Sequence, residues 1–215
     1  MDDSRARSAA GMTLVEVLVV LFIISVLAAF VTPVVWLARQ KADKDLVRHE
    51  LTRMALGVEN FADQDARADW PPATLQELGI GGGNGLNEGI ESLVACLAAG
   101  RGEGPYFDFD AERLTNLDGD EGPERVLKES LAVVFGDTQL REYVDLWGTP
   151  YVYFPSKAYG TKARYSTHDG GEFEACVIRD AASGLWPAPA RFVIWSCGPD
   201  GINENGGGDD ICSWR

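Results

Sequence analysis

An apolar run near the N-terminus constrains this chain more than any other feature. From Met12 to Ala38 the sequence reads MTLVEVLVVLFIISVLAAFVTPVVWLA, and Glu16 is its only charged residue. About 20 apolar residues in helical form cross the hydrocarbon core of a bilayer. The core helix of a soluble protein is usually apolar on one face, whereas this run is apolar on all sides. The sequence therefore predicts a membrane-spanning helix at residues 12–38.

A small residue precedes this run instead of following it. A cleavable secretory signal has its cleavage site after the apolar region, but Gly11 lies directly before Met12. Cleavage after Gly11 would leave the run on the mature protein and would create an α-amino group on Met12. The carboxylate of Glu16 costs a few kcal/mol in a bilayer unless it is neutralised or paired. The new amine would supply a cation at the same depth.

The residues around Gly11 resemble the processing site of type IV pilins and type II secretion pseudopilins. Gly-Met-Thr-Leu-Val-Glu at residues 11–16 leads into the apolar run, and Pro33 lies inside that run. The resemblance implies that a prepilin peptidase cuts after Gly11 and methylates Met12. It also implies that Glu16 pairs with an N-terminal amine during assembly. Pro33 would loosen the helix, because proline lacks the N–H of one backbone hydrogen bond.

Apolar residues continue beyond the span as a single stripe. They recur every three or four residues, as on one face of a helix: Val47, Leu51, Met54, Val58 and Phe61. Trp70-Pro71-Pro72 should end this helix, because a residue before proline disfavours helical backbone. We therefore expect a leader at residues 1–11, a transmembrane and assembly helix at 12–38, a helical stem at 39–69, and an extracytoplasmic globular domain at 70–215.

The globular domain has its strand-like segments late in the sequence. Three short segments are rich in aromatic and β-branched residues and bounded by Gly or Pro: Tyr151–Phe154, Phe173–Ile178 and Arg191–Cys197. No helix-length pattern separates them, which predicts antiparallel pairing. Ala73–Leu78 and Ile90–Leu97 predict short helices. The expected fold class is α+β, a long N-terminal helix packed on a small antiparallel sheet, as in type IV pilin-like proteins.

The acidic charge belongs to the globular domain. The chain has 33 acidic and 19 basic side chains, a net charge of −14, and residues 1–61 carry equal numbers of each. Such a surface argues against a nucleic-acid partner, because phosphate binding needs basic residues. Asp118 and Asp120 lie in a Gly- and acid-rich stretch. They could ligate a hard cation, but a solvated loop is the simpler interpretation.

One late motif resembles a segment of the major pseudopilins of type II secretion, the GspG type. Asp-Leu-Trp-Gly-Thr-Pro-Tyr-Val-Tyr at residues 145–153 is similar to their Asp-Pro-Trp-Gly-Asn-Pro-Tyr segment. Leu146 takes the place of the first Pro, and Thr149 that of the Asn. We interpret the motif as a structural turn that feeds a strand, with Trp147 capping the core.

A second motif is similar to the calcium-binding loop of the same proteins. Residues 196–211 read SCGPDGINENGGGDDI. Calcium takes about six to eight oxygen ligands in flexible geometry, and the spacing here does not match an EF-hand. The resemblance implies calcium as the cofactor, although the residues alone leave a loop without an ion equally open. Its ligands would be the carboxylates of Asp200, Asp209 and Asp210, with the backbone carbonyls of Cys197 and Asn205 as weaker candidates.

Two of the four cysteines flank this loop. A bridge between Cys197 and Cys212 would close a loop of about 15 residues and stabilise the fold by roughly 3 kcal/mol in the chain-entropy model. Such bridges form outside the cytoplasm. The sequence leaves this bridge and two free thiols equally open. Cys96 and Cys176 lie in apolar stretches, and we expect them to be buried thiols.

No motif in the sequence indicates catalysis. His49 and His168 are not accompanied by a Ser or Cys nucleophile motif, and we interpret the protein as non-enzymatic. The resemblance implies a structural subunit that self-associates into a helical filament and drives protein export. Its partners would be prepilin peptidase, other pseudopilins and inner-membrane components of the secretion system.

The resemblance also implies a single pass through the bacterial inner membrane, with the globular domain in the periplasm. The count of basic residues favours the opposite orientation, because two precede the span and four follow it closely. Two alternatives remain open at this point. One is a type IV pilus pilin, and the other is a membrane-anchored, calcium-dependent binding module, such as an adhesin, that never polymerises.

Overall fold

The computed structural model describes most of the chain, namely residues 13–64, 69–98, 105–123, 137–189 and 191–215. The expected leader, with Gly11, and the new N-terminal residue Met12 lie outside the described residues. The chain divides into two compact units, Met1–Ala42 and Asp43–Arg215. One helix of 51 residues, α1 (Leu14–Gln64), contributes to both units.

Within the first unit, α1 remains helical through Pro33. Two hydroxyl groups of this segment donate to carbonyls one turn earlier: Ser25 to Leu21 at 2.7 Å, and Thr32 to Ala28 at 2.8 Å. These bonds satisfy the hydroxyls inside the helix itself. The segment therefore presents few unsatisfied polar groups to its surroundings.

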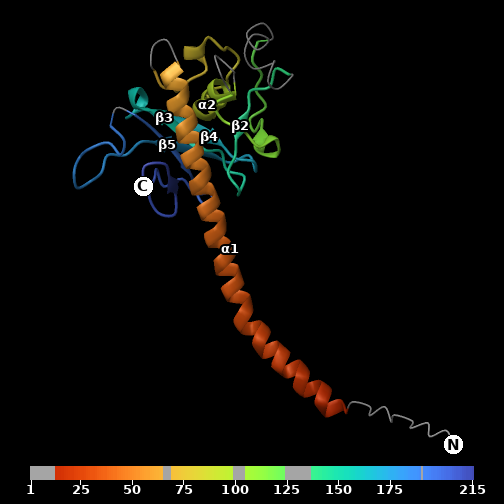
Figure 1. Ribbon diagram of the computed structural model, residues 1–215. Coiled ribbons are helices and arrows are strands. Elements are labelled where there is room, and N and C mark those ends of the chain that lie inside the picture. The colour runs from red at the N-terminus through yellow and green to blue at the C-terminus, as the bar shows by residue number, and fades with distance from the viewer. Residues whose placement is uncertain (1–12, 65–68, 99–104, 124–136, 190) are drawn as a thin grey trace, which may run out of the picture. The chain divides into compact units, whose positions relative to one another are not determined.

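The second unit contains the last part of α1, a second helix and several short strands (Figure 1). The helix is α2 (Glu88–Ala98). In the described part of the chain the strands are β1 (Leu114–Thr115), β2 (Glu142–Tyr143), β3 (Val152–Pro155), β4 (Lys162–Ser166), β5 (Glu172–Cys176), β6 (Phe192–Ser196) and β7 (Ile211–Cys212). They pair antiparallel in three small sheets, β1-β2, β3-β6-β7 and β4-β5.

This architecture confirms the expected α+β fold class and refines it. The three predicted strand segments correspond to β3, β5 and β6, and their pairing is antiparallel. They belong to two separate sheets, however, because β5 pairs with β4 and not with β3 or β6. The strand β4 was not predicted, since its sequence Lys-Ala-Arg-Tyr-Ser has too few apolar residues. The short helix at Ile90–Leu97 is confirmed as α2. The one expected at Ala73–Leu78 is a single 3-10 turn, Gln76–Leu78.

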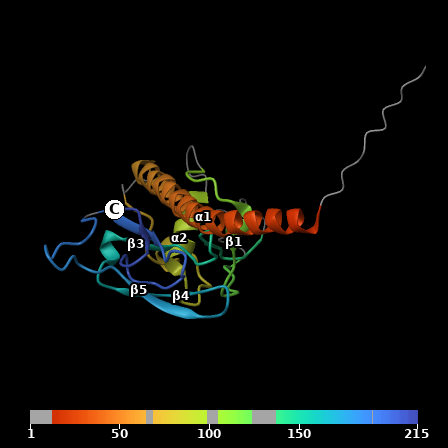
Figure 2. The same cartoon turned by 90° about the horizontal axis from the view of Figure 1, so that it is seen from below.

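The apolar stripe on the stem forms one side of the core. All five of its residues, from Val47 to Phe61, are buried, with exposures between 0 and 9%. Gly57 lets a loop pack closely against α1, because a Cβ there would lie 2.9 Å from the carbonyl oxygen of Tyr106. In Figure 2 the stem part of α1 lies on one side of this unit and the β4-β5 ribbon on the other. The core between them includes side chains of α2 and of β3-β6-β7.

Candidate functional site

The first part of α1 presents an apolar surface. Between Leu14 and Leu37 its large apolar side chains are 37–79% exposed. By length and composition, this helix could cross a membrane. Exposed apolar surface of this extent marks contact with lipid or with other proteins. The predicted spanning segment is thus helical and apolar on all sides over its described residues.

Glu16 forms a capping box with Thr13 at the start of α1. The backbone N–H and the hydroxyl of Thr13 donate to Oε2 of Glu16, at 2.8 and 2.9 Å. In return the N–H of Glu16 lies 3.3 Å from the hydroxyl oxygen of Thr13. This reciprocal pattern satisfies donors that a helix start leaves unpaired. The sequence analysis missed it, although Thr-Leu-Val-Glu is a recognisable capping signature.

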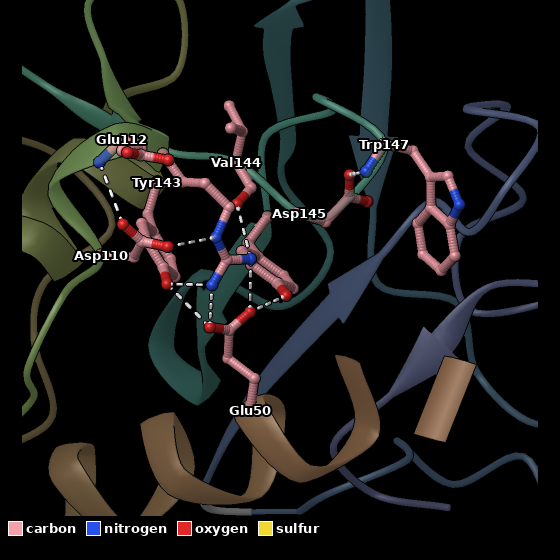
Figure 3. A network of polar contacts seen from close by, with 9 residues as sticks. Glu50, Asp110, Glu112, Tyr143, Val144, Asp145 and Trp147 are labelled. Atoms are coloured by element: carbon pink, nitrogen blue, oxygen red, sulfur yellow. Dashed lines mark hydrogen bonds and ion pairs between the residues drawn. The ribbon is translucent and has the colours of Figure 1, made fainter. Parts of the chain in front are cut away.

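A second acidic residue of α1, Glu50, is held by a buried polar network (Figure 3). Its carboxylate accepts hydrogen bonds from Tyr143 at 2.7 Å and Tyr151 at 2.5 Å, and it forms an ion pair with Arg113. The Glu50 and Arg113 side chains are 13% and 17% exposed. Burial disfavours the charged carboxylate, but the bonds from Arg113 and the tyrosines outweigh it and lower the pKa of Glu50. The network joins the stem helix to the β1-β2 sheet and to the segment before β3.

The segment 145–153 forms a turn, as its sequence predicted. Oδ1 of Asp145 accepts from the N–H groups of Trp147 (2.9 Å) and Thr149 (3.0 Å), and Oδ2 accepts from the hydroxyl of Ser196 (2.6 Å). Gly148 adopts a φ of 86°, which favours glycine. Figure 3 shows Asp145 beside Trp147, which packs against the core. The turn therefore ties the strand β3 to the end of β6.

In the C-terminal loop, the side chain of Asp210 holds the backbone in place through hydrogen bonds. Its Oδ2 accepts from the N–H groups of Gly206 (2.6 Å) and Glu204 (3.2 Å), while its buried Oδ1 has no hydrogen-bond partner. Burial, more than the nearby carboxylates, raises the pKa of Asp210 to about 6. The amide of Asn205 accepts from the N–H of Cys176 at 2.8 Å. The loop is thus held by its own side chains, with one orphaned carboxylate oxygen.

The other two aspartates of this loop lie near each other. Burial and the charge of Asp200 raise the pKa of Asp209, whose carboxylate also lies 3.7 Å from Nζ of Lys44. Oδ1 of Asp200 accepts from the N–H of Ile202 at 2.9 Å. The three aspartates do not form a set whose oxygens all lie within 4.8 Å of one another. Asp200 and Asp209 thus lie close enough to repel each other, and Oδ1 of Asp210 accepts no hydrogen bond from the described residues.

All four cysteines are free thiols in this structure, so it does not contain the Cys197–Cys212 bridge that the sequence left open. The register explains why. Trp195 faces Cys212 and Ser196 faces Ile211, so continuing this pairing would place Cys197 opposite Asp210, diagonal to Cys212. Diagonal neighbours lie about 7–8 Å apart at Cα, farther than a disulfide normally spans. Cys96 is buried as expected, whereas Cys176 is only partly buried.

A different set of carboxylates meets inside the second unit. Three carboxylates offer oxygens that all lie within 4.8 Å of one another. They belong to Glu91 of α2, to Asp118 in the loop after β1, and to Glu142 of β2. The neighbouring Asp120 is only 8% exposed. The interpretation of Asp118 and Asp120 as a solvated loop is therefore wrong for Asp120. Of these carboxylates, the sequence indicated only Asp118 and Asp120 as possible ligands, because Glu91 and Glu142 are separated by 51 positions and meet only in the folded chain.

Comparison with known proteins bears on the N-terminal end. Residues 6–32 match the family model of the prokaryotic N-terminal methylation motif. The chain carries this methylation motif. It includes Gly11, Met12 and Glu16, and Pro33 follows directly after it. No curated protein and no solved structure matches the chain.

The methylation motif is typical of type IV pilin-like proteins and pseudopilins, which are generally structural subunits and not enzymes. It implies processing by prepilin peptidase and polymerisation of the pilin-like kind. The observed α+β fold, with its long apolar N-terminal helix, is consistent with a type IV pilin-like fold. The helix and the motif together are consistent with a membrane-anchored protein.

Proposed function

We propose that this protein is a structural subunit of a type II secretion pseudopilus. The observation that carries the proposal is an exposed apolar helix whose start coincides with a methylation motif at residues 6–32. Prepilin peptidase would cut after Gly11 and methylate Met12. The mature subunits would then stack through α1 into a short filament that drives export of folded proteins. In this arrangement the globular unit lies in the periplasm.

Assembly requires neighbouring helices to replace lipid around each span. The exposed side chains between Leu14 and Leu37 supply the apolar surface for that exchange. Glu16 would set the register by pairing with an N-terminal amine, since an unpaired carboxylate is unfavourable in an apolar environment. The Thr13–Glu16 capping box keeps this carboxylate at the start of α1.

The choice of a pseudopilus over a type IV pilus rests on the segment 145–153. The turn around Asp145 is similar in sequence to that of the major pseudopilins. Its aspartate stabilises the turn by accepting hydrogen bonds from Trp147, Thr149 and Ser196. An export assay decides this point: loss of the protein should stop release of folded secreted proteins and leave surface pili unchanged. Loss of pili with normal export would refute the pseudopilus.

Substitution of Glu16 tests the assembly mechanism. We expect Glu16→Ala to insert into membranes normally but to form no filaments, as measured by cross-linking and electron microscopy. Thr13→Ala is the matched control, because it removes the cap at a cost of about 1 kcal/mol but keeps the carboxylate. It should still assemble. Normal assembly of Glu16→Ala, or equal loss in both variants, would contradict the pairing role.

Mass spectrometry of the mature N-terminus separates this function from a simple anchor. An N-methylated Met12 is the expected result for an assembling subunit. An N-terminus that retains Met1 would instead support a membrane-anchored binding module that never polymerises, and it would overturn the proposal.

We also propose that the C-terminal loop binds calcium through Asp200, Asp209 and Asp210, with the carbonyls of Cys197 and Asn205 completing the site. The orphaned Oδ1 of Asp210 and the repulsion between Asp200 and Asp209 support it. Calcium at 100 times its dissociation constant would stabilise the fold by about 2.7 kcal/mol. Addition of EDTA should lower the melting temperature, and Asp209→Asn should reduce that change. Identical melting with and without EDTA would refute the site.

A further inference from the structure

We propose that Glu91, Asp118, Asp120 and Glu142 form a second divalent-cation site, separate from the C-terminal loop, and that calcium is the ion it takes. Glu91 belongs to α2 and Glu142 to β2, and the two aspartates lie in the segment that follows β1. A bound ion would tie these three parts of the globular unit together.

The spacing of the oxygens matches a calcium coordination shell. Calcium binds its ligands at about 2.3–2.6 Å, so two oxygens on one ion are at most about 5 Å apart. The oxygens of Glu91, Asp118 and Glu142 lie within 4.8 Å of one another. They can therefore reach one central ion with little movement of the backbone.

Three carboxylate oxygens in this set have no hydrogen-bond partner among the residues that the structure describes. They are Oε1 and Oε2 of Glu91, which is 2% exposed, and Oδ1 of Asp120, which is 8% exposed. Leaving a buried carboxylate oxygen without a donor costs free energy. By contrast, the other oxygen of Asp120 accepts from the N–H of Asn84 at 3.2 Å. Glu91 thus lies among carboxylates, and neither of its oxygens accepts a hydrogen bond from a described donor.

The charge of this set is not balanced by any cation that the structure describes. In the described part of the chain, none of the four carboxylates forms an ion pair with a Lys or Arg. The donors present are neutral and serve mainly Glu142: Leu117 N–H at 2.8 Å and the Asn87 amide at 3.1 Å. Burial, followed by the charges of its acidic neighbours, raises the pKa of Glu91 far above its usual range. The set therefore requires either a proton or a metal ion.

The chemistry of the ligands favours calcium over other ions. The site offers carboxylate oxygens from four side chains and no His or Cys ligand, so it suits a hard cation and not zinc. Magnesium usually keeps several of its waters and is held by one or two carboxylates. Because Glu91, Glu142 and Asp120 are buried, an ion here would exchange most of its waters for carboxylate oxygens. Calcium, with flexible geometry and bidentate carboxylates, fits better.

Calcium titration of the full-length protein in detergent, after removal of metals with EDTA, tests the site. The background is Asp200→Asn/Asp209→Asn, so that the C-terminal loop no longer contributes. We expect this protein to bind calcium by isothermal titration calorimetry and to melt at a higher temperature with calcium. Glu91→Gln in the same background should weaken binding by more than about tenfold. Glu112→Gln, which removes an exposed carboxylate in the same way, should bind as the background does.

Glu91→Gln also distinguishes a metal from a shared proton. In EDTA this variant should melt at least as high as the background, because its amide is neutral at every pH, has almost the same shape, and needs no bound proton to remove the repulsion. In saturating calcium the order should reverse. If calcium gives neither binding heat nor a melting shift in the background, Glu91 is a protonated acid and the site is refuted. A response to magnesium but not to calcium would overturn the choice of ion. These outcomes are independent of filament assembly.

Discussion

Glu50, which is partly buried, and Glu91, which is fully buried, lie on helices of the same globular unit, but their surroundings are opposite. Glu50 meets a guanidinium and two tyrosine hydroxyls, and its pKa is lowered. Glu91 meets carboxylates, and burial and their charges raise its pKa. The first charge is balanced by Arg113, whereas the described residues offer the second no ion pair. Burial alone therefore does not show whether an acidic residue is charged, because the neighbouring groups determine the direction in which its pKa shifts.

The largest effect should come from removing the carboxylate that the chain satisfies. Glu50→Ala leaves the largely covered guanidinium of Arg113, whose side chain is 17% exposed, without its counter-charge and removes the acceptor of Tyr143 and Tyr151. We expect a loss of about 3–5 kcal/mol in the free energy of unfolding, as for other broken buried ion pairs. Urea unfolding in detergent, followed by tryptophan fluorescence, measures it.

Glu59→Ala is the control for this prediction. Glu59 also lies on α1 and pairs with Arg191, but their side chains are 34% and 56% exposed. Exposed pairs of this kind contribute up to about 1 kcal/mol. Equal losses in Glu50→Ala and Glu59→Ala would show that the buried network has no special weight.

A smaller effect should come from the neutral group beside the carboxylate set. Asn87 is fully buried, has a φ of 53°, accepts from the Ser166 N–H at 2.9 Å and donates to Glu142. In EDTA, Asn87→Ala should cost roughly 2–4 kcal/mol, because it leaves buried groups unpaired and strains the left-handed backbone. Asn87→Gly removes only the backbone part of that cost. If both variants unfold like wild type in urea, the amide does not support Glu142.

The smallest effect is a change with pH. Glu50→Gln should cost roughly 1.5–3 kcal/mol at pH 7, since hydrogen bonds to a charged group are worth about this much. The pKa of Glu50 is lower in the folded protein than its unfolded value of about 4.3. Its contribution is therefore complete above that value and is lost as the pH falls through the folded pKa. Unfolding curves of wild type and Glu50→Gln should converge below about pH 4. A constant difference down to pH 3 would contradict a charged Glu50.

Local patterns made the elements predictable. The uninterrupted apolar run predicted the exposed helix, and the spacing of Val47 through Phe61 predicted the buried face of the stem. Aromatic and β-branched residues predicted β3, β5 and β6. The same rules failed for β4, because its residues are polar and its pairing with β5 supplies the order. An element was therefore predicted where its own residues carry the hydrophobic pattern, and it was missed where only its pairing partner stabilises it.

The sites divide in a similar way. Thr13 and Glu16 are three positions apart, so the sequence contains their capping box even though it was not recognised. Glu50 has no local signal that predicts its network, because its partners Arg113 and Tyr151 are 63 and 101 positions away. Asp120 was assigned to a solvated loop for the same reason.

The sequence by itself determined that this protein carries an apolar, motif-bearing helix and an acidic α+β globular unit. These features are local patterns of periodicity, hydrophobicity and motif spacing. They involve residues that are near one another in the sequence, so they can be recognised without the fold. Only the tertiary structure decided which acidic residues are neutralised and which are not. Electrostatic energy depends on distance in space and on burial, and folding sets both by bringing together residues from remote parts of the chain.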